Sequence, residues 1–133
     1  MGRAEPAEEE AGVTTYFVSG HLDLTMDAFR EHYAPLIAAT IAEDPDASFV
    51  VGDARGCDLM AQLYLRDAHA LRVQVFHMLA KPRNNVGGFP TIGGFGSDGT
   101  RDAAMTEASD ADIAWVRPGR QGSGTAANLA RRY

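Results

Sequence analysis

The strongest structural signal in the chain is Phe49-Val50-Val51-Gly52-Asp53-Ala54-Arg55-Gly56-Cys57-Asp58-Leu59-Met60-Ala61. Three apolar residues lead into a polar turn bracketed by glycines, and an amphipathic segment follows, as when a buried strand passes through a tight loop into a helix. Glycine lets a ligand approach the backbone closely, and the first N–H groups of a helix attract anions. The pattern therefore predicts either a ligand-binding loop or an ordinary strand–helix connection. Its spacing matches neither the P-loop nor the dinucleotide-binding motif.

The length and composition indicate one folded domain of an ordinary globular class. The chain has 133 residues, a single cysteine (Cys57) and no apolar run of the roughly 20 residues that cross a bilayer. Residues 1–12 lack the apolar core of a secretion signal, so we expect a reducing, cytoplasmic setting without disulfides. The four histidines are scattered. We therefore expect no metal and no bound cofactor.

The charge distribution favours a small-molecule partner. Residues 1–12 hold one arginine and four glutamates, so half of the formal net charge of −6 lies in this segment, which we expect to be a disordered acidic leader. Residues 13–133 are then also mildly acidic. Nonspecific nucleic-acid binding relies on clustered lysine and arginine, so nucleic acid is a poor candidate.

Apolar patterning along residues 13–133 predicts an α/β domain. Strand-like segments are expected at 13–18, 48–51, 72–77 and 113–116. Helical segments are expected from Thr25 to residue 44, with a kink or a second start at Pro35, and then at 56–69, 101–108 and 126–132. Short connections between alternating strands and helices indicate a mainly parallel sheet of four to five strands with helices on both faces.

Residues 81–100 differ in composition from the rest of the chain. Six of these twenty residues are glycine, and Gly-Gly-Phe occurs twice. We expect a long glycine-rich loop here, followed by a helix capped by Thr100. The loop is either a lid, with Phe89 and Phe95 covering a bound base or contacting a second copy of the chain, or a floppy connection.

Three glycine- or serine-marked segments follow strands, and parallel strands place such ends at one edge of the sheet. They are Ser19-Gly20-His21, Gly52 to Asp58, and Gly122-Ser123-Gly124-Thr125. Helix N-termini and hydroxyls there suit a phosphate, and carboxylates suit ribose hydroxyls, so the convergence predicts a nucleotide or nucleoside site. Two residues are candidate catalytic groups: Asp53 and Asp58. The candidate ligand-binding residues are Ser19, Gly20, His21, Gly52, Arg55, Gly56, Arg101, Asp102, Gly122, Ser123, Gly124, Thr125 and Asn128. Helix capping alone also explains Ser123 and Thr125.

Two of these motifs resemble a known superfamily. Gly56-Cys57-Asp58-Leu59-Met60-Ala61 resembles the G-I-D-x-x-A segment of DprA, and with Gly52-Asp53-Ala54-Arg55 it is similar to the YspA-type branch of the SLOG superfamily. Gly122-Ser123-Gly124-Thr125-Ala126-Ala127-Asn128 resembles the P-G-G-x-G-T-x-x-E pattern of LOG-type phosphoribohydrolases. It is also similar to the S-G-T-x-x-E loop of nucleoside 2-deoxyribosyltransferases. The resemblance implies a Rossmann-like domain, a nucleotide-type ligand and a homo-oligomer.

The departures from these patterns bear on activity. Asn128 occupies the position of the glutamate that takes part in catalysis or ribose binding in both enzyme families, and Gln62 replaces the histidine of the DprA pattern. Asparagine cannot act as nucleophile or general base, so another carboxylate (Asp53, Asp58 or Asp102) has to take over. We expect cleavage or transfer of an N-glycosidic bond. A non-catalytic nucleotide sensor is the alternative, and a DprA-like single-stranded DNA binder is a third.

Overall fold

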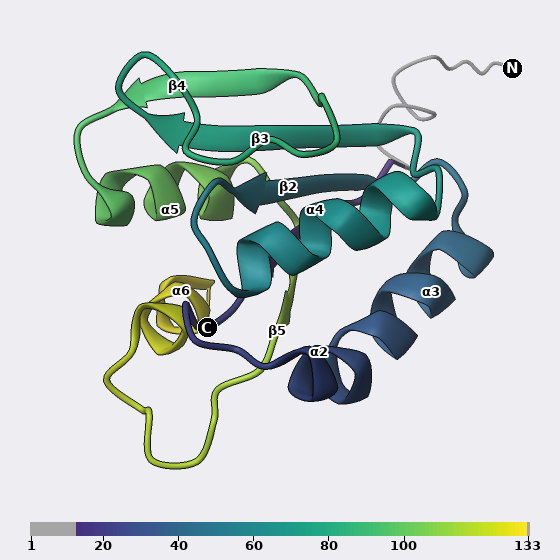
Figure 1. Cartoon of the computed structure of the whole chain (residues 1–133), viewed down its shortest axis with the longest axis horizontal. Coiled ribbons are helices and arrows are strands. Elements are labelled where there is room, and N and C mark those ends of the chain that lie inside the picture. The colour runs from purple at the N-terminus through teal and green to yellow at the C-terminus, as the bar shows by residue number, and fades with distance from the viewer. Residues whose placement is uncertain (1–12, 133) are drawn as a thin grey trace, which may run out of the picture.

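Five parallel strands form one sheet in the order β4-β3-β2-β1-β5 in the computed structural model, which describes residues 13–132. This arrangement confirms the α/β class, the parallel sheet and the helices on both faces (Figure 1). The elements in chain order are β1 (Thr15–Ser19), α2 (Met26–His32), α3 (Ala34–Glu43), β2 (Ser48–Gly52), α4 (Cys57–Asp67), β3 (Arg72–Met78), β4 (Thr91–Phe95), α5 (Asp98–Glu107), β5 (Ala111–Ala114) and α6 (Gly124–Arg132). The acidic leader predicted at residues 1–12 lies outside the described residues.

Side chains of the central strands alternate between two apolar layers. Val18, Phe49 and Val51 point into one layer, where they pack with buried residues of α2, α3 and α4. Phe17 and Val50 point into the other layer and pack with Met105 of α5. Helices α2, α3 and α4 therefore cover one face of the sheet, while α5 covers the other with α6 beside it. Both faces of β1 and β2 are buried, as is usual for a parallel sheet.

Local signals explain the ends of the first helices. The Thr25 hydroxyl accepts a hydrogen bond from the backbone N–H of Ala28 at 3.1 Å and so caps α2. Pro35 lies in the first turn of α3, where its missing N–H costs nothing. Of the two possibilities for Pro35, the structure has the second helix start.

The long loop predicted at 81–100 is only partly present. Residues 79–90 are irregular, but Thr91–Phe95 form β4, the edge strand beside β3. The sequence does not indicate this strand, because glycine has a low strand propensity. The strand forms through backbone hydrogen bonds to β3 and through tertiary contacts. A Cβ on Gly93 would collide with the His77 ring, so the glycine lets β4 approach β3. Helix α5 also begins earlier than expected: the Ser97 hydroxyl, not Thr100, caps it by accepting from the Thr100 N–H at 3.1 Å.

The strand order reverses beside β1. The chain builds outward from β1 through β2 and β3 to β4, then returns through α5 to place β5 on the other side of β1. The connections that leave β1 and β5 therefore diverge, and such a point opens a crevice beyond the carboxyl ends of the strands. Within residues 13–132, no helix combines the length and the apolar character needed to cross a membrane.

Candidate functional site

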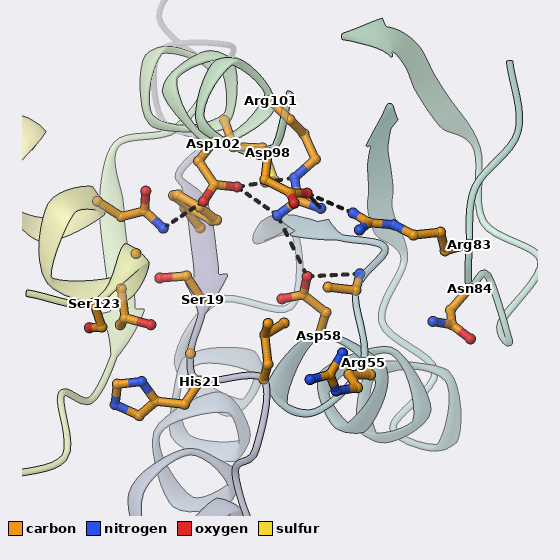
Figure 2. Close-up of a pocket in the computed structure, with 18 of the residues that line it drawn as sticks. Ser19, His21, Arg55, Asp58, Arg83, Asn84, Asp98, Arg101, Asp102 and Ser123 are labelled. Carbon is orange, nitrogen blue, oxygen red and sulfur yellow. Dashed lines mark hydrogen bonds and ion pairs between the residues drawn. The ribbon is translucent and has the colours of Figure 1, made fainter. Parts of the chain in front are cut away.

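A cavity of about 390 Å³ lies beyond the carboxyl ends of the central strands, at the point where the strand order reverses. Figure 2 shows side chains from β1, α4, α5 and the loop before α6 around it. Of the residues predicted from the sequence, those that line it are Ser19, Gly20, His21, Arg55, Asp58, Arg101, Asp102, Ser123, Gly124, Thr125 and Asn128. The remaining four, Gly52, Asp53, Gly56 and Gly122, lie outside the lining.

Arg101 is the electrostatic centre of the site. Its side chain is buried, with 5 % of the residue exposed. Nη1 donates to Asp53 at 2.8 Å, Nη2 donates to Asp102 at 2.8 Å and also lies 3.9 Å from Asp58. Burial alone would lower the pKa of Arg101, but the carboxylates of Asp58 and Asp102 outweigh it and raise the pKa. A permanently charged guanidinium therefore holds these aspartates around one point.

Asp53 serves as an anchor below this cluster. It is 0 % exposed and accepts four hydrogen bonds: one from Arg101 and three from Arg83, including the Arg83 backbone N–H at 2.7 Å. Burial acts to raise the pKa of Asp53, but the hydrogen bonds from Arg83 and Arg101 prevail and lower it to about 2. Asp53 was one of the two predicted catalytic groups. Because it is fully engaged and does not line the cavity, we assign it to fixing Arg83 and Arg101.

Asp58, the other predicted catalytic residue, does line the cavity. It stands in the first turn of α4, 7 % exposed, and its Oδ2 accepts from the backbone N–H of Ala54 at 3.1 Å. Burial raises the pKa of Asp58 to about 7, although Arg101 and the Ala54 hydrogen bond oppose this shift. A carboxyl group that exchanges its proton near neutral pH is suited to general acid–base chemistry.

The glycines of the Gly52–Gly56 motif are explained by packing. A Cβ on Gly52 would lie well under 3.0 Å from Oδ2 of Asp58 and would also meet Arg101. Gly56 has φ +75°, and a Cβ there would collide with the Leu22 carbonyl. These two glycines therefore let Asp58 and the turn before α4 fit, and they do not form a phosphate cradle.

The N-terminus of α6 is the part of the cavity best suited to an anion. Ser123 caps the helix, since its hydroxyl accepts from the Ala126 N–H at 3.2 Å, and the first turn of α6 holds no acidic residue. A Cβ on Gly124 would meet nothing within 4 Å, so the backbone there is open to a ligand. Arg120 and the exposed Arg55 also line the cavity, and Arg55 pairs with no residue among 13–132. Free N–H groups and nearby cations favour phosphate or carboxylate.

His21 has a positional role. Its Nε2 accepts a hydrogen bond from the backbone N–H of Arg117 at 2.9 Å, which requires the neutral ring with its proton on Nδ1. Burial lowers the pKa of His21, and the positive charges of Arg120 and Arg117 lower it further. His21 thus holds the loop that connects β5 to α6 and carries Arg120.

Ser19 and Asn128 both line the cavity but differ in their hydrogen bonding. Ser19, at the end of β1, lines the cavity, and its hydroxyl is buried and has no hydrogen-bond partner among residues 13–132. A buried polar group without a partner is unusual and indicates a missing contact. Asn128 is hydrogen-bonded at both ends of its amide: its Nδ2 donates to Asp102 at 3.2 Å, and its Oδ1 accepts from Arg131.

Sequence reasoning missed four polar lining residues: Arg83, Asn84, Asp98 and Arg120. Arg83 and Asn84 belong to the irregular segment after β3. Their position, as polar residues that follow a strand, was the signal in the sequence that could have identified them as site residues. Gln62 fastens this segment, since its Nε2 donates to the Gly52 carbonyl at 2.9 Å and its Oε1 accepts from the Val86 N–H at 3.0 Å. The Gln62 that departs from the DprA pattern thus ties this segment to the site.

Comparison of the chain with protein-family models gives no match. Comparison with curated proteins gives none either, and no solved structure matches.

Proposed function

We propose that this domain binds a nucleotide or a related nucleoside phosphate and cleaves or transfers its N-glycosidic bond, with Asp58 as the acid–base group. One observation carries the proposal: a buried carboxyl with a pKa of about 7 faces a polar cavity that also holds an anion-attracting helix end. Perturbed carboxyl groups in such cavities are typical of catalytic sites.

The two ends of the cavity suit the two ends of such a ligand. Arg55, Arg120 and the N-terminus of α6 supply positive potential for a phosphate. Asp58, Asp102 and the unpartnered Ser19 hydroxyl supply acceptors and one donor for sugar hydroxyls. A volume of about 390 Å³ is within the range of sites for small ligands.

The reaction follows from the protonated form of Asp58. When the bond between C1′ of the sugar and the base nitrogen breaks, its electron pair leaves with the base, which takes the proton of Asp58. The sugar is left with an oxocarbenium-like centre at C1′. Water adds to C1′ and gives one proton to the Asp58 carboxylate, which restores the acid. The net products are the free base and the sugar phosphate; in transfer, an acceptor base adds in place of water.

A non-catalytic sensor is the second candidate, and Asn128 favours it. In the enzyme families that the C-terminal loop resembles, this position holds a glutamate, whereas here the amide is held between Asp102 and Arg131. A sensor requires the same ligand contacts without bond cleavage, so binding and turnover have to be measured separately.

The experiment is a thermal-shift screen with nucleosides, their mono- and diphosphates, NAD and ADP-ribose, followed by chromatography of each stabilising mixture for free base. A ligand that binds only the native state raises the midpoint by mass action. Base release by the unchanged protein, lost in Asp58→Asn and kept in the exposed control Asp67→Asn, supports the enzyme. Stabilisation without base release supports the sensor, and no stabilisation by any probe contradicts both. A single-stranded oligonucleotide tests the DNA-binding alternative, which predicts steep salt dependence.

A further inference from the structure

Asp102 is a second carboxylate on the cavity wall, and its surroundings differ from those of Asp58. Asp58 comes from α4 and Asp102 from α5, so the two approach the strand ends from opposite faces of the sheet (Figure 2). Both lie near Nη2 of Arg101, Asp102 at 2.8 Å and Asp58 at 3.9 Å. Because both oxygens lie near the same nitrogen, they are at most roughly 7 Å apart, which allows both carboxylates to face one sugar.

Hydrogen bonding separates the two groups. Asp102 accepts two hydrogen bonds from Arg101, at 3.0 and 2.8 Å, and a third from Nδ2 of Asn128 at 3.2 Å. These three donors hold the Asp102 carboxylate in place. Asp58 accepts one backbone N–H and has Arg101 only at the longer distance. Two acidic groups whose environments differ in this way commonly take different roles in one reaction.

The Ser19 hydroxyl provides independent evidence that a ligand occupies this part of the cavity. Ser19 is only 4 % exposed, and its hydroxyl lacks a partner among residues 13–132. Ser19 lines the same cavity as the two aspartates. A ligand hydroxyl placed there would satisfy it.

We infer that Asp58 and Asp102 have different roles: Asp58 exchanges the proton, while the Asp102 carboxylate, fixed by Arg101 and Asn128, faces the positive charge that develops on the sugar. This inference rests on the proposed function and deepens it. In the enzyme families that the C-terminal loop resembles, a glutamate stands at the position of Asn128. Here Asp102 supplies the negative charge that such a glutamate would place near the sugar. Asn128 becomes a positioning residue, since its amide orients Asp102 without touching the reacting atoms.

The test is a pH–rate profile with adenosine, guanosine, cytidine and uridine 5′-monophosphates as probes, using the full chain and two variants. Asp102→Asn removes the fixed anion, and kcat should fall on the order of 100-fold, the usual effect of losing one electrostatic stabiliser. Rate should decline with rising pH as Asp58 loses its proton. Because the charge of Asp102 helps to raise the pKa of Asp58, this decline should begin at lower pH in the variant. This shift follows from the charge of Asp102 alone, so the fall in kcat of the folded variant is the readout that a purely structural role would not produce.

Asn128→Ala keeps every carboxylate and removes only the orienting amide. Its kcat should fall on the order of tenfold, with KM and the alkaline decline nearly unchanged. If Asp102→Asn does not fold, the kcat of Asn128→Ala still tests the proposed role of Asp102. Asp67→Asn, the same chemical change on the exposed end of α4, is the control and should behave as the unchanged protein.

The outcomes separate the two proposals. A loss of rate with an earlier alkaline decline in Asp102→Asn supports the division of roles. Unchanged kcat in both Asp102→Asn and Asn128→Ala, while the unchanged protein releases base, overturns the division and leaves the enzyme intact. If the unchanged protein releases no base from these four probes or from any ligand of the thermal-shift screen, the proposed reaction fails and the role of Asp102 fails with it.

Discussion

Replacement of Ser19 by alanine should stabilise the ligand-free protein and weaken ligand binding. Both effects follow from the removal of one oxygen atom. The Ser19 hydroxyl is buried without a partner among residues 13–132, while the Ser19 carbonyl accepts from the Tyr33 hydroxyl at 2.8 Å. Ser19→Ala removes the unpaired hydroxyl and keeps the carbonyl contact. A buried polar group without a partner costs about 1–3 kcal/mol. The substitution removes only one oxygen atom and so leaves little empty space, and the free energy of unfolding should rise by about 1 kcal/mol or more.

The expected loss of affinity follows from the same hydroxyl. If a sugar hydroxyl of the ligand pairs with Ser19, the variant loses one hydrogen bond, worth about 0.5–1.5 kcal/mol, or roughly 2- to 12-fold in Kd. Urea denaturation measures the first effect. Titration of Trp115 fluorescence with AMP measures the second. Trp115 is the only tryptophan, and its ring lies 6.2 Å from that of His21, which lines the cavity.

Ser109→Ala is the matched control for this pair of effects. The Ser109 hydroxyl donates to the Met105 carbonyl and accepts from Arg132, each at 2.6 Å, and does not line the cavity. It should lose about 0.5–1.5 kcal/mol of stability and keep its affinity, because a half-buried hydroxyl that makes hydrogen bonds is removed. The reasoning is refuted if Ser19→Ala destabilises the free protein like the control and leaves AMP affinity unchanged.

Three further predictions concern the cluster around Arg101. The folded-state pKa of Asp58, about 7, exceeds its ordinary value of 3.8, so the stability this group contributes is present below about pH 4 and lost as pH rises through 7. Urea denaturation should therefore find Asp58→Asn progressively more stable than the unchanged protein between pH 5 and 8, and a constant difference would contradict the assignment. Asp53→Asn breaks a buried ion pair with Arg101 and should cost about 3–5 kcal/mol at pH 7; equal unfolding midpoints would rule out its anchoring role. Gly52→Ala forces the Asp58 carboxyl aside and should cost about 1–3 kcal/mol, whereas Gly99→Ala, with open space around it, should be neutral or slightly stabilising by the same denaturation assay.

The part of the fold that could be predicted has strong local signals. β1 and β2 combine β-branched or aromatic residues with a following glycine, and each leads into a capped or amphipathic helix. Their parallel pairing then follows from the short connections. β4 could not be predicted, because Ile92-Gly93-Gly94 becomes a strand only through the backbone of β3 and the room that Gly93 leaves for His77.

The candidate site divides in the same way. Convergence of the strand ends followed from topology, which brought Ser19, Asp58 and Ser123 to one cavity. The difference between Asp53 and Asp58 did not follow, because both are aspartates in one polar turn. Arg83, far along the chain, occupies one and leaves the other facing the cavity. The ion pair with Arg83 therefore determines which of the two carboxyl groups can meet a ligand. The spacing of residues in the motif does not predict this long-range contact.

Under the proposed function, the helices around the cavity favour one direction for the nucleotide. The N-termini of α4 and α5 already carry their own carboxylates, Asp58 and Asp98, whereas the first turn of α6 carries none. An acidic side chain in the first turn uses the favourable potential of the helix end, so a phosphate gains least at α4 and α5 and most at α6. The reverse orientation would set the phosphate against Asp58 and place the sugar where Arg120 offers only donors. The proposed sugar contacts at Asp58 and Asp102 thus depend on the absence of an acid at the start of α6 as much as on the aspartates themselves.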